Sequence, residues 1–298
     1  MKNTILFFVM LMTSSYVAKG CDICGCSSGG NFFGILPQYQ AHFLGFRYKY
    51  SQFKSLHPDD GSYGSDYFNT TEIWGRYALT KRLHLYAILP FQFTKRIEGN
   101  SVNQIHEFGD ATIIANYLIF DNSRSEGRVF KQTFQFGAGL KLPSGKNNLV
   151  QNFQRLPENL QPGSGTTDVI LNAIYTTRFK NFGLNADLNY KINQENTKNY
   201  KQGDKIYASG RFFIWFRSKG ISMLPHLGLD YESSNTDSKY NKPVEFTGGE
   251  SLLSSLGIDT YVKNISVGCR VQNALYQHLN EGNTSGKWRF SAQVLYLF

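Results

Sequence analysis

Long apolar runs are missing from most of this chain. After the first twenty of its 298 residues, no stretch of about 18 consecutive apolar residues occurs, the length that a membrane-spanning helix needs. The mean hydropathy is −0.34. A protein that crosses a membrane with helices is therefore excluded. A membrane barrel is not, because lipid-facing and lumen-facing residues alternate along its strands and keep the average polar.

Motifs for haem attachment and nucleic-acid binding are also missing. The four cysteines include no C-x-x-C-H sequence, so covalent haem is not indicated. The formal net charge is +9, but Lys and Arg are spread among loops and alternating strand positions, without a basic helix or a base-stacking motif. We therefore expect no nucleic-acid partner, and we interpret the cations as solvated loops and a cationic lumen.

Aromatic residues, in contrast, are abundant. They make up 15% of the chain, with 24 Phe and 18 Tyr. This share is high for a soluble domain and is expected where aromatic girdles lie at both membrane interfaces of a barrel.

The N-terminus has the pattern of an export signal. Lys2 supplies the charged end, residues 5–12 the apolar run, and Ala18-Lys19-Gly20 a small-x-small cleavage site. Cleavage after Gly20 makes Cys21 the first mature residue, and acylation of Cys21 as a lipoprotein is an open alternative. The chain therefore divides into a signal peptide, a Cys-rich periplasmic segment and a transmembrane β-barrel, at residues 1–20, 21–39 and 40–298.

The last stretch of the chain resembles the closing strand of bacterial outer-membrane barrels, the segment that their assembly machinery reads. A strand has period two because successive side chains point to opposite faces. One face here is apolar and ends on an aromatic residue at the final position, with Phe290, Ala292, Val294, Tyr296 and Phe298. The other face begins with Arg289, Ser291 and Gln293.

From about residue 40 the pattern predicts about twelve strands with one apolar face each. Five tight turns alternate with six longer loops, as in bacterial barrels with short periplasmic turns and long extracellular loops. The stretch at 98–100 is predicted as one of the loops, and the stretch at 121–127 as one of the turns. Pro90 is predicted to mark a bulge, because proline cannot donate to a ladder. An even count places both termini in the periplasm, and we expect an all-β, antiparallel barrel in the outer membrane.

Several short motifs resemble a known family from about residue 107 onward. These are Gly109-Asp110-Ala111, Ala115-Asn116-Tyr117, G-A-G-L-K-L-P-S-G at 137–145 and G-S-G-T-T-D at 163–168. They are similar to the outer-membrane proteins associated with the phenol meta-cleavage (MetA) pathway. The resemblance implies a barrel that transports hydrophobic compounds. The Cys-rich start is foreign to that pattern, which counts against an aromatic substrate.

The Cys-rich start offers one candidate site. Cys21, Cys24 and Cys26 place three thiolates in a short segment, a set that suits soft metals such as Cu(I) or Zn(II). A disulfide is an alternative, because exported thiols meet oxidants, and lipidation of Cys21 is another. Cys269 lies on an apolar strand face and is interpreted as a small hydrophobic residue.

The polar strand faces offer the second candidate site, the barrel lumen. Mixed charges there line a solute path or pair across the interior as a plug, and a barrel of this size can be filled by side chains. The expected lumen-lining residues are Arg47, Lys49, Glu72, Arg76, Asp110, Lys141, Asp187, Lys191, Arg211, Asp230, Asp259 and Arg270.

The sequence thus favours a porin-like transporter for a small solute, with outer-membrane lipid and the barrel-assembly machinery as partners and a metal link through the cysteines. A non-transporting anchor barrel is the alternative. An outer-membrane lipid hydrolase is disfavoured because the histidines are scattered and none has a serine spaced on the same strand face in the manner of a His–Ser pair. We therefore expect no enzyme activity. The six histidines are His42, His57, His84, His106, His226 and His278.

Overall fold

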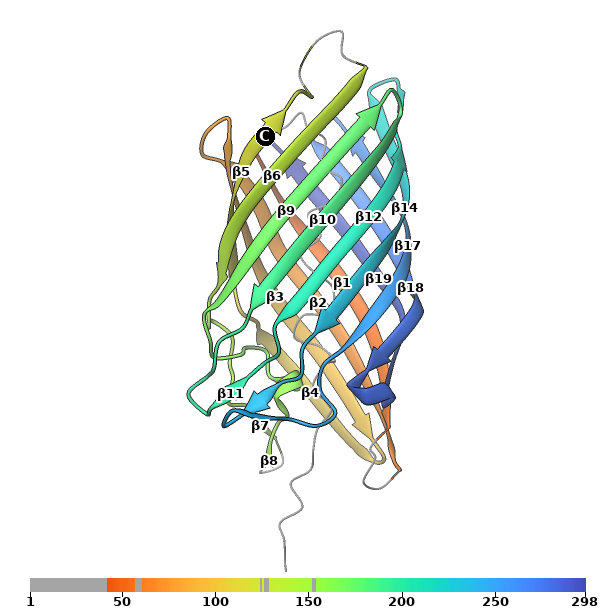
Figure 1. Ribbon diagram of the computed structural model, residues 1–298. Helices are drawn as coiled ribbons and strands as arrows, with labels where there is room; N and C mark the ends of the chain where they lie inside the picture. Colours follow the sequence, from red (N-terminus) through yellow and green to blue (C-terminus); the bar gives the residue numbers. More distant parts are fainter. Residues whose placement is uncertain (1–41, 57–60, 124, 126–128, 152–153) are drawn as a thin grey trace, which may run out of the picture.

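The chain folds into a closed antiparallel β-barrel (Figure 1). The computed structural model describes residues 42–56, 61–123, 125, 129–151 and 154–298. The strands of the wall are β1 (Phe43–Leu56), β2 (Tyr63–Ala78), β3 (Leu83–Glu98), β4 (Ser101–Phe108), β5 (Thr112–Asp121), β6 (Phe130–Lys141), β9 (Asp168–Phe179), β10 (Phe182–Ile192), β12 (Lys205–Ile214), β13 (Phe216–Ser218), β14 (Ile221–Ser234), β17 (Gly249–Val262), β18 (Ile265–Leu279) and β19 (Thr284–Leu297).

These segments fill twelve positions in the wall. β4 and β5 pair one after the other with β3, and β12 and β13 pair in the same way with β14, so each couple counts as one strand. The first and last strands close the ring, with Phe43 opposite Leu297 and Ser55 opposite Thr284. The prediction of an all-β antiparallel barrel of about twelve strands is confirmed.

The two ends of the barrel differ in their connections. Tight turns join β2 to β3, β9 to β10 and β17 to β18 at the end where the C-terminus lies (Figure 1). In the turn before β14, Lys219 and Gly220 both have positive φ, the conformation that matches the twist of a hairpin. This is the periplasmic end. The long connections at 142–167, 193–204 and 235–248 lie at the opposite, extracellular end.

Two connections depart from the expected alternation. β3 and β4 are joined at the extracellular end by the two-residue turn Gly99-Asn100, where a longer loop was expected. At the periplasmic end β5 stops at Asp121 and β6 begins only at Phe130, where a tight turn was expected.

Pro90 lies where β3 changes its partner from β5 to β4, and its carbonyl accepts a hydrogen bond from the Gly109 amide at 2.9 Å. The missing N–H is therefore tolerated at a break in the ladder.

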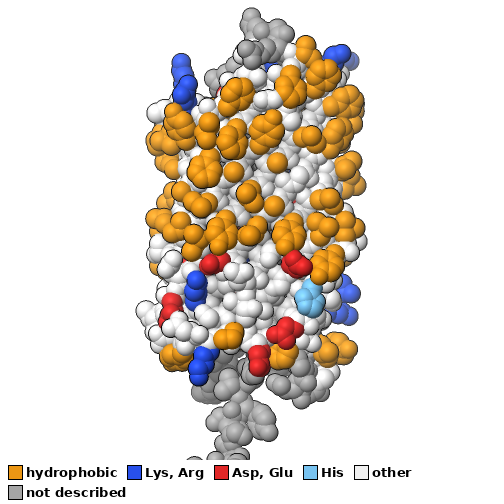
Figure 2. Space-filling model, viewed as in Figure 1, with side chains coloured by type: hydrophobic (Ala, Val, Ile, Leu, Met, Phe, Trp, Pro, Cys, Tyr) orange, Lys and Arg blue, Asp and Glu red, His pale blue; other side chains and the backbone are white. Residues whose placement is uncertain are grey.

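The outer surface carries a broad apolar belt. Figure 2 shows hydrophobic side chains over most of one face, and charged side chains gathered mainly toward the extracellular end. On β1, Leu44 and Phe46 are 56% and 59% exposed, and on the closing strand Val294, Tyr296 and Phe298 are also exposed. Phe290 and Ala292 share that outer face but are partly covered. Such a belt faces hydrocarbon, because a closed sheet pairs all the backbone groups of its wall and leaves only side chains toward lipid.

Candidate functional site in the barrel lumen

The lumen is polar and charged along much of its length. Nine of the twelve charged residues that the sequence assigned to the lumen are buried. The other three, Lys49, Asp110 and Lys191, line an internal cavity. The buried nine are Arg47, Glu72, Arg76, Lys141, Asp187, Arg211, Asp230, Asp259 and Arg270.

The periplasmic end of the interior is closed by an apolar cluster, which we call the periplasmic plug. Its side chains come from nine of the twelve wall strands, and all of them are at least nine-tenths buried. Burial of this kind from all around a barrel means that the side chains fill its cross-section. The plug consists of Phe43, Trp74, Tyr86, Ile88, Ile114, Ile170, Ile174, Phe213, Leu224, Tyr261, Leu295 and Leu297.

Glycines make room for these large side chains. A methyl group on Gly183 of β10 would collide with the Phe213 ring, which crosses over it from β12. Alternation of small and large inward residues is how a narrow barrel is filled without voids. The plug is thus built into the sheet itself.

Above the plug, toward the extracellular side, lies a layer of buried ion pairs. Glu72 accepts from Arg47 Nε at 2.6 Å and pairs with Lys49 Nζ at 2.7 Å. The Arg47 guanidinium lies over the Trp74 ring, 4.5 Å from its centroid. A planar, weakly hydrated cation suits this position between a carboxylate and an aromatic face. The contact joins the ionic layer to the plug.

A second ionic group is centred on Asp230. Its carboxylate accepts hydrogen bonds from Arg211, from Tyr207 Oη at 2.7 Å and from Gln272 Nε2 at 2.8 Å. Arg270 Nη1 lies 3.7 Å away. Asp230 is fully buried, and such a carboxylate is tolerated only with this many partners.

Neutral amides extend the buried polar network among the plug residues, with Asn172 between Ile170 and Ile174 along β9. Asn172 on β9 receives a hydrogen bond from Asn116 at 2.5 Å and donates to Asn189 at 2.9 Å and to Asp187 at 3.2 Å. These contacts cross from β5 to β10 through β9. Polar bonds of this kind between strands fix the side chains in place, because each buried amide needs its partners.

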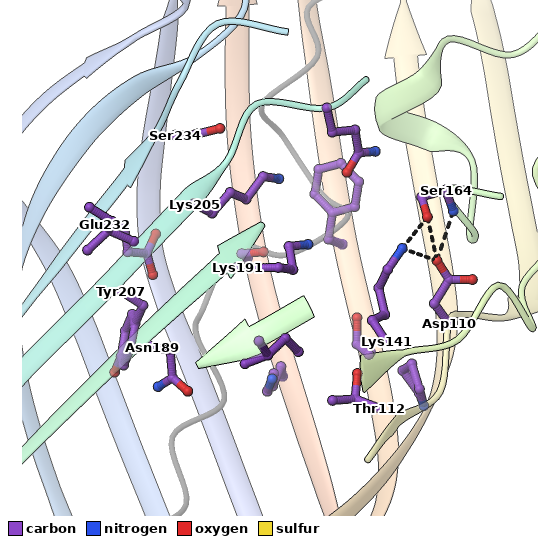
Figure 3. Close-up of a pocket in the computed structure, with 18 of the residues that line it drawn as sticks. Asp110, Thr112, Lys141, Ser164, Asn189, Lys191, Lys205, Tyr207, Glu232 and Ser234 are labelled. Atoms are coloured by element: carbon purple, nitrogen blue, oxygen red, sulfur yellow. Dashed lines mark hydrogen bonds and ion pairs between the residues drawn. The ribbon is translucent and has the colours of Figure 1, made fainter. Parts of the chain in front are cut away.

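A cavity of about 200 Å³ lies above these layers. Its described lining combines charged side chains with an apolar wall, and Figure 3 shows several of the charged groups converging on it. The charged residues are Lys49, Glu72, Asp110, Lys141, Lys191, Lys205, Glu232 and Arg289. The main apolar residues are Phe53, Phe68, Ile88, Pro90, Ile170 and Leu279.

One side of this cavity is a compact ionic cluster around Lys141. Its ammonium group pairs with Asp110 Oδ2 at 2.6 Å and with Asp168 Oδ2 at 2.8 Å, and it also contacts the Ser164 hydroxyl (Figure 3). Asp110 in turn accepts from the Ser164 amide at 2.9 Å and from the Gly145 amide at 3.0 Å. The cluster therefore ties both ends of the β6–β9 connection to the barrel wall.

Three of the four motifs that carry the family resemblance meet in this cluster. Asp110 comes from the first motif, Lys141 and Gly145 from the third, and Ser164 and Asp168 from the fourth. The contacts among them join residues 23 to 54 positions apart in sequence. Their common task in the fold is to anchor the long loop to the barrel wall.

The anchored loop forms a second closure, which we call the extracellular cap. The short 3₁₀ helix η2 (Glu158–Leu160) and its neighbours bring loop leucines onto side chains of the barrel wall. Gln161 braces the loop by donating to the carbonyl oxygens of Leu149 and Leu156 and accepting from the Leu149 amide at 2.9 Å. The cap consists of Leu149, Leu156 and Leu160 from the loop and Phe53, Phe68, Ile105 and Leu279 from the wall.

The other two long loops are joined to each other beside the cap. Asp237 accepts from Tyr200 Oη and from the Gly203 amide, both at 2.6 Å. Burial raises the pKa of Asp237, against the opposing effect of these hydrogen bonds. The strands β11 (Tyr200–Lys201), β15 (Ser238–Lys239) and β16 (Lys242–Pro243) form a small sheet here. β7 (Val150–Gln151) pairs with β8 (Gln154–Arg155) in the neighbouring loop.

Sequence reasoning missed five residues of this site. Ser164, Asp168, Lys205, Glu232 and Arg289 line the cavity or pair with its lining. Arg289 Nη1 lies 2.8 Å from Glu232 across the cavity rim. Ser164 and Asp168 stood within a motif already noted, and that signal was sufficient to find them. Lys205 and Glu232 lie near strand ends, where the predicted boundaries were least certain.

The expected metal site stays a prediction, whereas one of the histidines is found in the barrel interior. Cys21, Cys24 and Cys26 lie outside the described residues, and within the described part of the chain no group of three metal-ligating side chains occurs. His226 is buried, with its Nε2 3.8 Å from Asp259. Among the described residues, no helix has the length and apolar character to cross a membrane.

Comparison with known proteins gives a family and a fold. Residues 47–212 match the family described as "Putative MetA-pathway of phenol degradation". No curated protein matches the chain. The crystal structure of an outer-membrane channel from Pseudomonas putida is similar, with a TM-score of 0.64 at 14% identity, covering 91% of this chain and 100% of that one. The β-domain of a Bordetella autotransporter matches with a TM-score of 0.52 at 11% identity, covering 87% of this chain and 100% of that one.

These findings agree with the geometry. The family match covers more than half of the chain and includes all the motifs that meet around Lys141. The shared fold is that of outer-membrane barrels, and the apolar belt of this barrel suits the same surroundings. The chain is thus a bacterial outer-membrane β-barrel and belongs to the family described as the putative MetA-pathway of phenol degradation.

Proposed function

We propose that the protein is an outer-membrane channel that passes a small solute through the barrel lumen, and that the structure represents its closed state. One observation carries the proposal: a charged cavity of about 200 Å³ is kept inside the barrel between the plug and the cap. Side chains alone can fill a barrel of this size. A cavity retained between two closures is therefore a compartment for something that enters.

The extracellular cap is the natural entrance. Three of its leucines, Leu149, Leu156 and Leu160, come from a loop, and loops open locally at a lower free-energy cost than strands paired on both sides. The exit toward the periplasm requires the plug side chains to change rotamers, because the strands that carry them stay in the closed sheet. The description of the Pseudomonas relative as an outer-membrane channel supports this proposal.

A non-transporting barrel is the second candidate, and the plug favours it. Twelve buried apolar side chains across the interior suit a permanent seal. A barrel of this kind would serve as an anchor or an assembly partner, with the lumen as a packed core.

Electrical recording separates the two candidates. The mature full-length protein, refolded into planar bilayers, is expected to give discrete conductance steps, and liposomes that contain it are expected to swell in small organic solutes. A protein that inserts, shown by its protease-resistant barrel, but gives neither current nor swelling would be the non-transporting barrel.

We further propose that the cysteine segment presents a soft metal at the periplasmic mouth. Three thiols within six positions support this, since thiolates select Cu(I) and Zn(II). Equilibrium dialysis of the reduced mature protein against either ion is expected to give stoichiometric binding. Binding should be lost in Cys24→Ser/Cys26→Ser and kept in Cys269→Ser, whose thiol lies on the outer face of β18. Equal binding by all three proteins would end the metal proposal.

A further inference from the structure

Two lysines face each other on neighbouring strands at the cavity. Lys191 on β10 and Lys205 on β12 are direct register partners. Both line the cavity, and Figure 3 shows them reaching into it from adjacent strands. Like charges placed directly opposite each other destabilise a sheet. Lys205 is also within electrostatic reach of Asp237, so the pair has some compensation within the protein. An anion bound between the two ammonium groups would remove the remaining repulsion.

The charged side chains of the described lining sum to a net positive charge. Its described residues include five cations and three carboxylates. The three carboxylates each have a lining cation at short range, in the pairs Glu72–Lys49, Asp110–Lys141 and Glu232–Arg289. Arg47 contacts Glu72, and Asp168 contacts Lys141, so these two residues add one charge of each sign. Among the described residues, the cavity therefore has an excess of two positive charges.

A third polar group extends the lysine row. Ser234 on β14 is the register partner of Lys205, so Lys191, Lys205 and Ser234 lie in one line across three adjacent strands. The Ser234 hydroxyl donates to the Asn235 carbonyl at 3.2 Å, a long bond that a stronger acceptor can replace. Two ammonium groups and a hydroxyl in a row suit the two oxygens of a carboxylate.

The rest of the cavity is apolar. Phe53 and Phe68 belong to the cap, and Ile88 and Ile170 belong to the plug. Both closures therefore contribute apolar surface to the cavity. A bare inorganic anion leaves this surface in contact with water. A ligand with an apolar body covers this surface and removes it from water, which is favourable.

The volume of the cavity limits the size of the ligand's apolar body. A dry protein cavity of about 150 Å³ holds one benzene molecule, and this cavity is somewhat larger, at about 200 Å³. It therefore accommodates a body of about six carbons together with a carboxylate.

We infer that the cavity is a binding site for a small amphiphilic anion, a carboxylate on a short apolar body, with the carboxylate held between Lys191 and Lys205 and the body against the apolar wall. The inference rests on the proposed function only in that this ligand would be the solute that the channel passes. Binding itself is separate from passage and can be measured without it.

Calorimetric titration of the full mature barrel in non-ionic detergent tests this site. The probes are hexanoate, 1-hexanol and hexylammonium, which share one body and differ in the head group, and acetate, which lacks the body. Hexanoate is expected to bind at least ten-fold more tightly than each of the others. Acetate binding as tightly as hexanoate would overturn the role of the apolar wall. Hexanol binding as tightly would overturn the role of the charge.

Paired substitutions locate the head group. Lys191→Gln/Lys205→Gln is expected to weaken hexanoate binding at least ten-fold and to leave hexanol unchanged, whereas Lys191→Arg/Lys205→Arg keeps hexanoate binding within about three-fold. The matched control is Lys81→Gln/Lys219→Gln, which removes the same charge from exposed periplasmic turns and should change nothing. If both glutamine pairs have the same effect, hexanoate responds to net charge alone and the site is wrong.

Conductance measured on the same samples separates this inference from the proposed function. A barrel that binds hexanoate through the lysine pair but never conducts would refute the channel and keep the site. A barrel that conducts, but whose affinity for hexanoate is unchanged by substitution of Lys191 and Lys205, would support the channel and refute the site.

Discussion

The two closures of the barrel are made of similar side chains but held in different ways. The periplasmic plug is carried by strands of the closed sheet, each bonded to a neighbour on both sides. In the extracellular cap, Leu149, Leu156 and Leu160 belong to a loop that is tied to the wall through Lys141, Asp110 and Gln161.

This difference indicates how the plug and the cap can each move. Apolar packing resists opening at both ends, but a plug residue leaves its place only by rotating within a fixed wall. The loop part of the cap can swing away as one unit once its polar ties break, because the backbone of this loop has few ladder bonds. We therefore expect mutations in the plug to cause steady leaks and mutations in the cap to cause gating events.

The largest effect is expected for Trp74→Ala in the plug. Trp74 is buried to 99% beneath Arg47, and its loss removes packing from the plug and the stacking partner of a buried cation. We expect the free energy of unfolding to fall by about 3–5 kcal/mol and a constant conductance to appear in bilayers. Trp288→Ala, on the exposed outer face, is the control. An equal conductance change in the two variants would mean that the plug does not seal the lumen.

A smaller effect is expected for Leu160→Ala in the cap. Leu160 is buried, and its loss should weaken the cap by about 3 kcal/mol, with brief openings in place of a constant leak. Limited proteolysis in the loop, compared with single-channel records, measures both effects. Val150→Ala on the same loop, where the side chain is exposed, should change neither. A constant leak from Leu160→Ala would contradict the idea that the two closures open differently.

Asp110→Asn should loosen the cap through its polar tie. The variant keeps the size of the side chain but weakens the charge-assisted bonds to Lys141, Gly145 and Ser164, at a cost of about 2 kcal/mol. Faster hydrogen exchange at the Gly145 and Ser164 amides is expected, with more frequent openings.

Asp66→Asn is the matched control for this variant. It weakens a more deeply buried pair, Asp66 with Arg96 at 2.6 Å, in the hairpin of β2 and β3. We expect a loss of stability there and no change in opening frequency. If both variants alter gating alike, the cap is not tied specifically through Asp110.

The smallest effect is a pH dependence of the extracellular loops. Burial raises the pKa of Asp237, while Tyr200 and Lys205 act against the shift and Glu158 adds to it. Because the folded protein holds this proton more tightly than the unfolded chain does, its contribution to stability is present at pH values below the ordinary Asp pKa. It is lost as the pH rises through the folded pKa.

Hydrogen exchange at the Gly203 amide checks this effect. Its protection should decrease as the pH rises through the acidic range, after correction for intrinsic exchange. Asp237→Asn should remove this dependence. An increase in protection over the same range would show that the pKa shift has the opposite sign.

The strand faces were predictable because they are a local property. Leu44 and Phe46 point outward and Gly45 and Arg47 inward for the sole reason that successive residues in a strand alternate. The same rule placed the charged residues inside. The expectation of a longer loop at 98–100 was wrong. Glu98 and Ser101 continue the two strands, so that only Gly99 and Asn100 form the turn.

The sequence by itself determined which side chains meet lipid and which meet the lumen, and that the sheet closes, since the period of two and the even strand count act over a few residues at a time. Only the tertiary structure decided that the β6–β9 loop turns inward as a cap and that Lys191 and Lys205 face the same cavity. Contacts such as Ser55 with Thr284, 229 positions apart, depend on how the closed ring brings distant strands together. No local pattern encodes that distance.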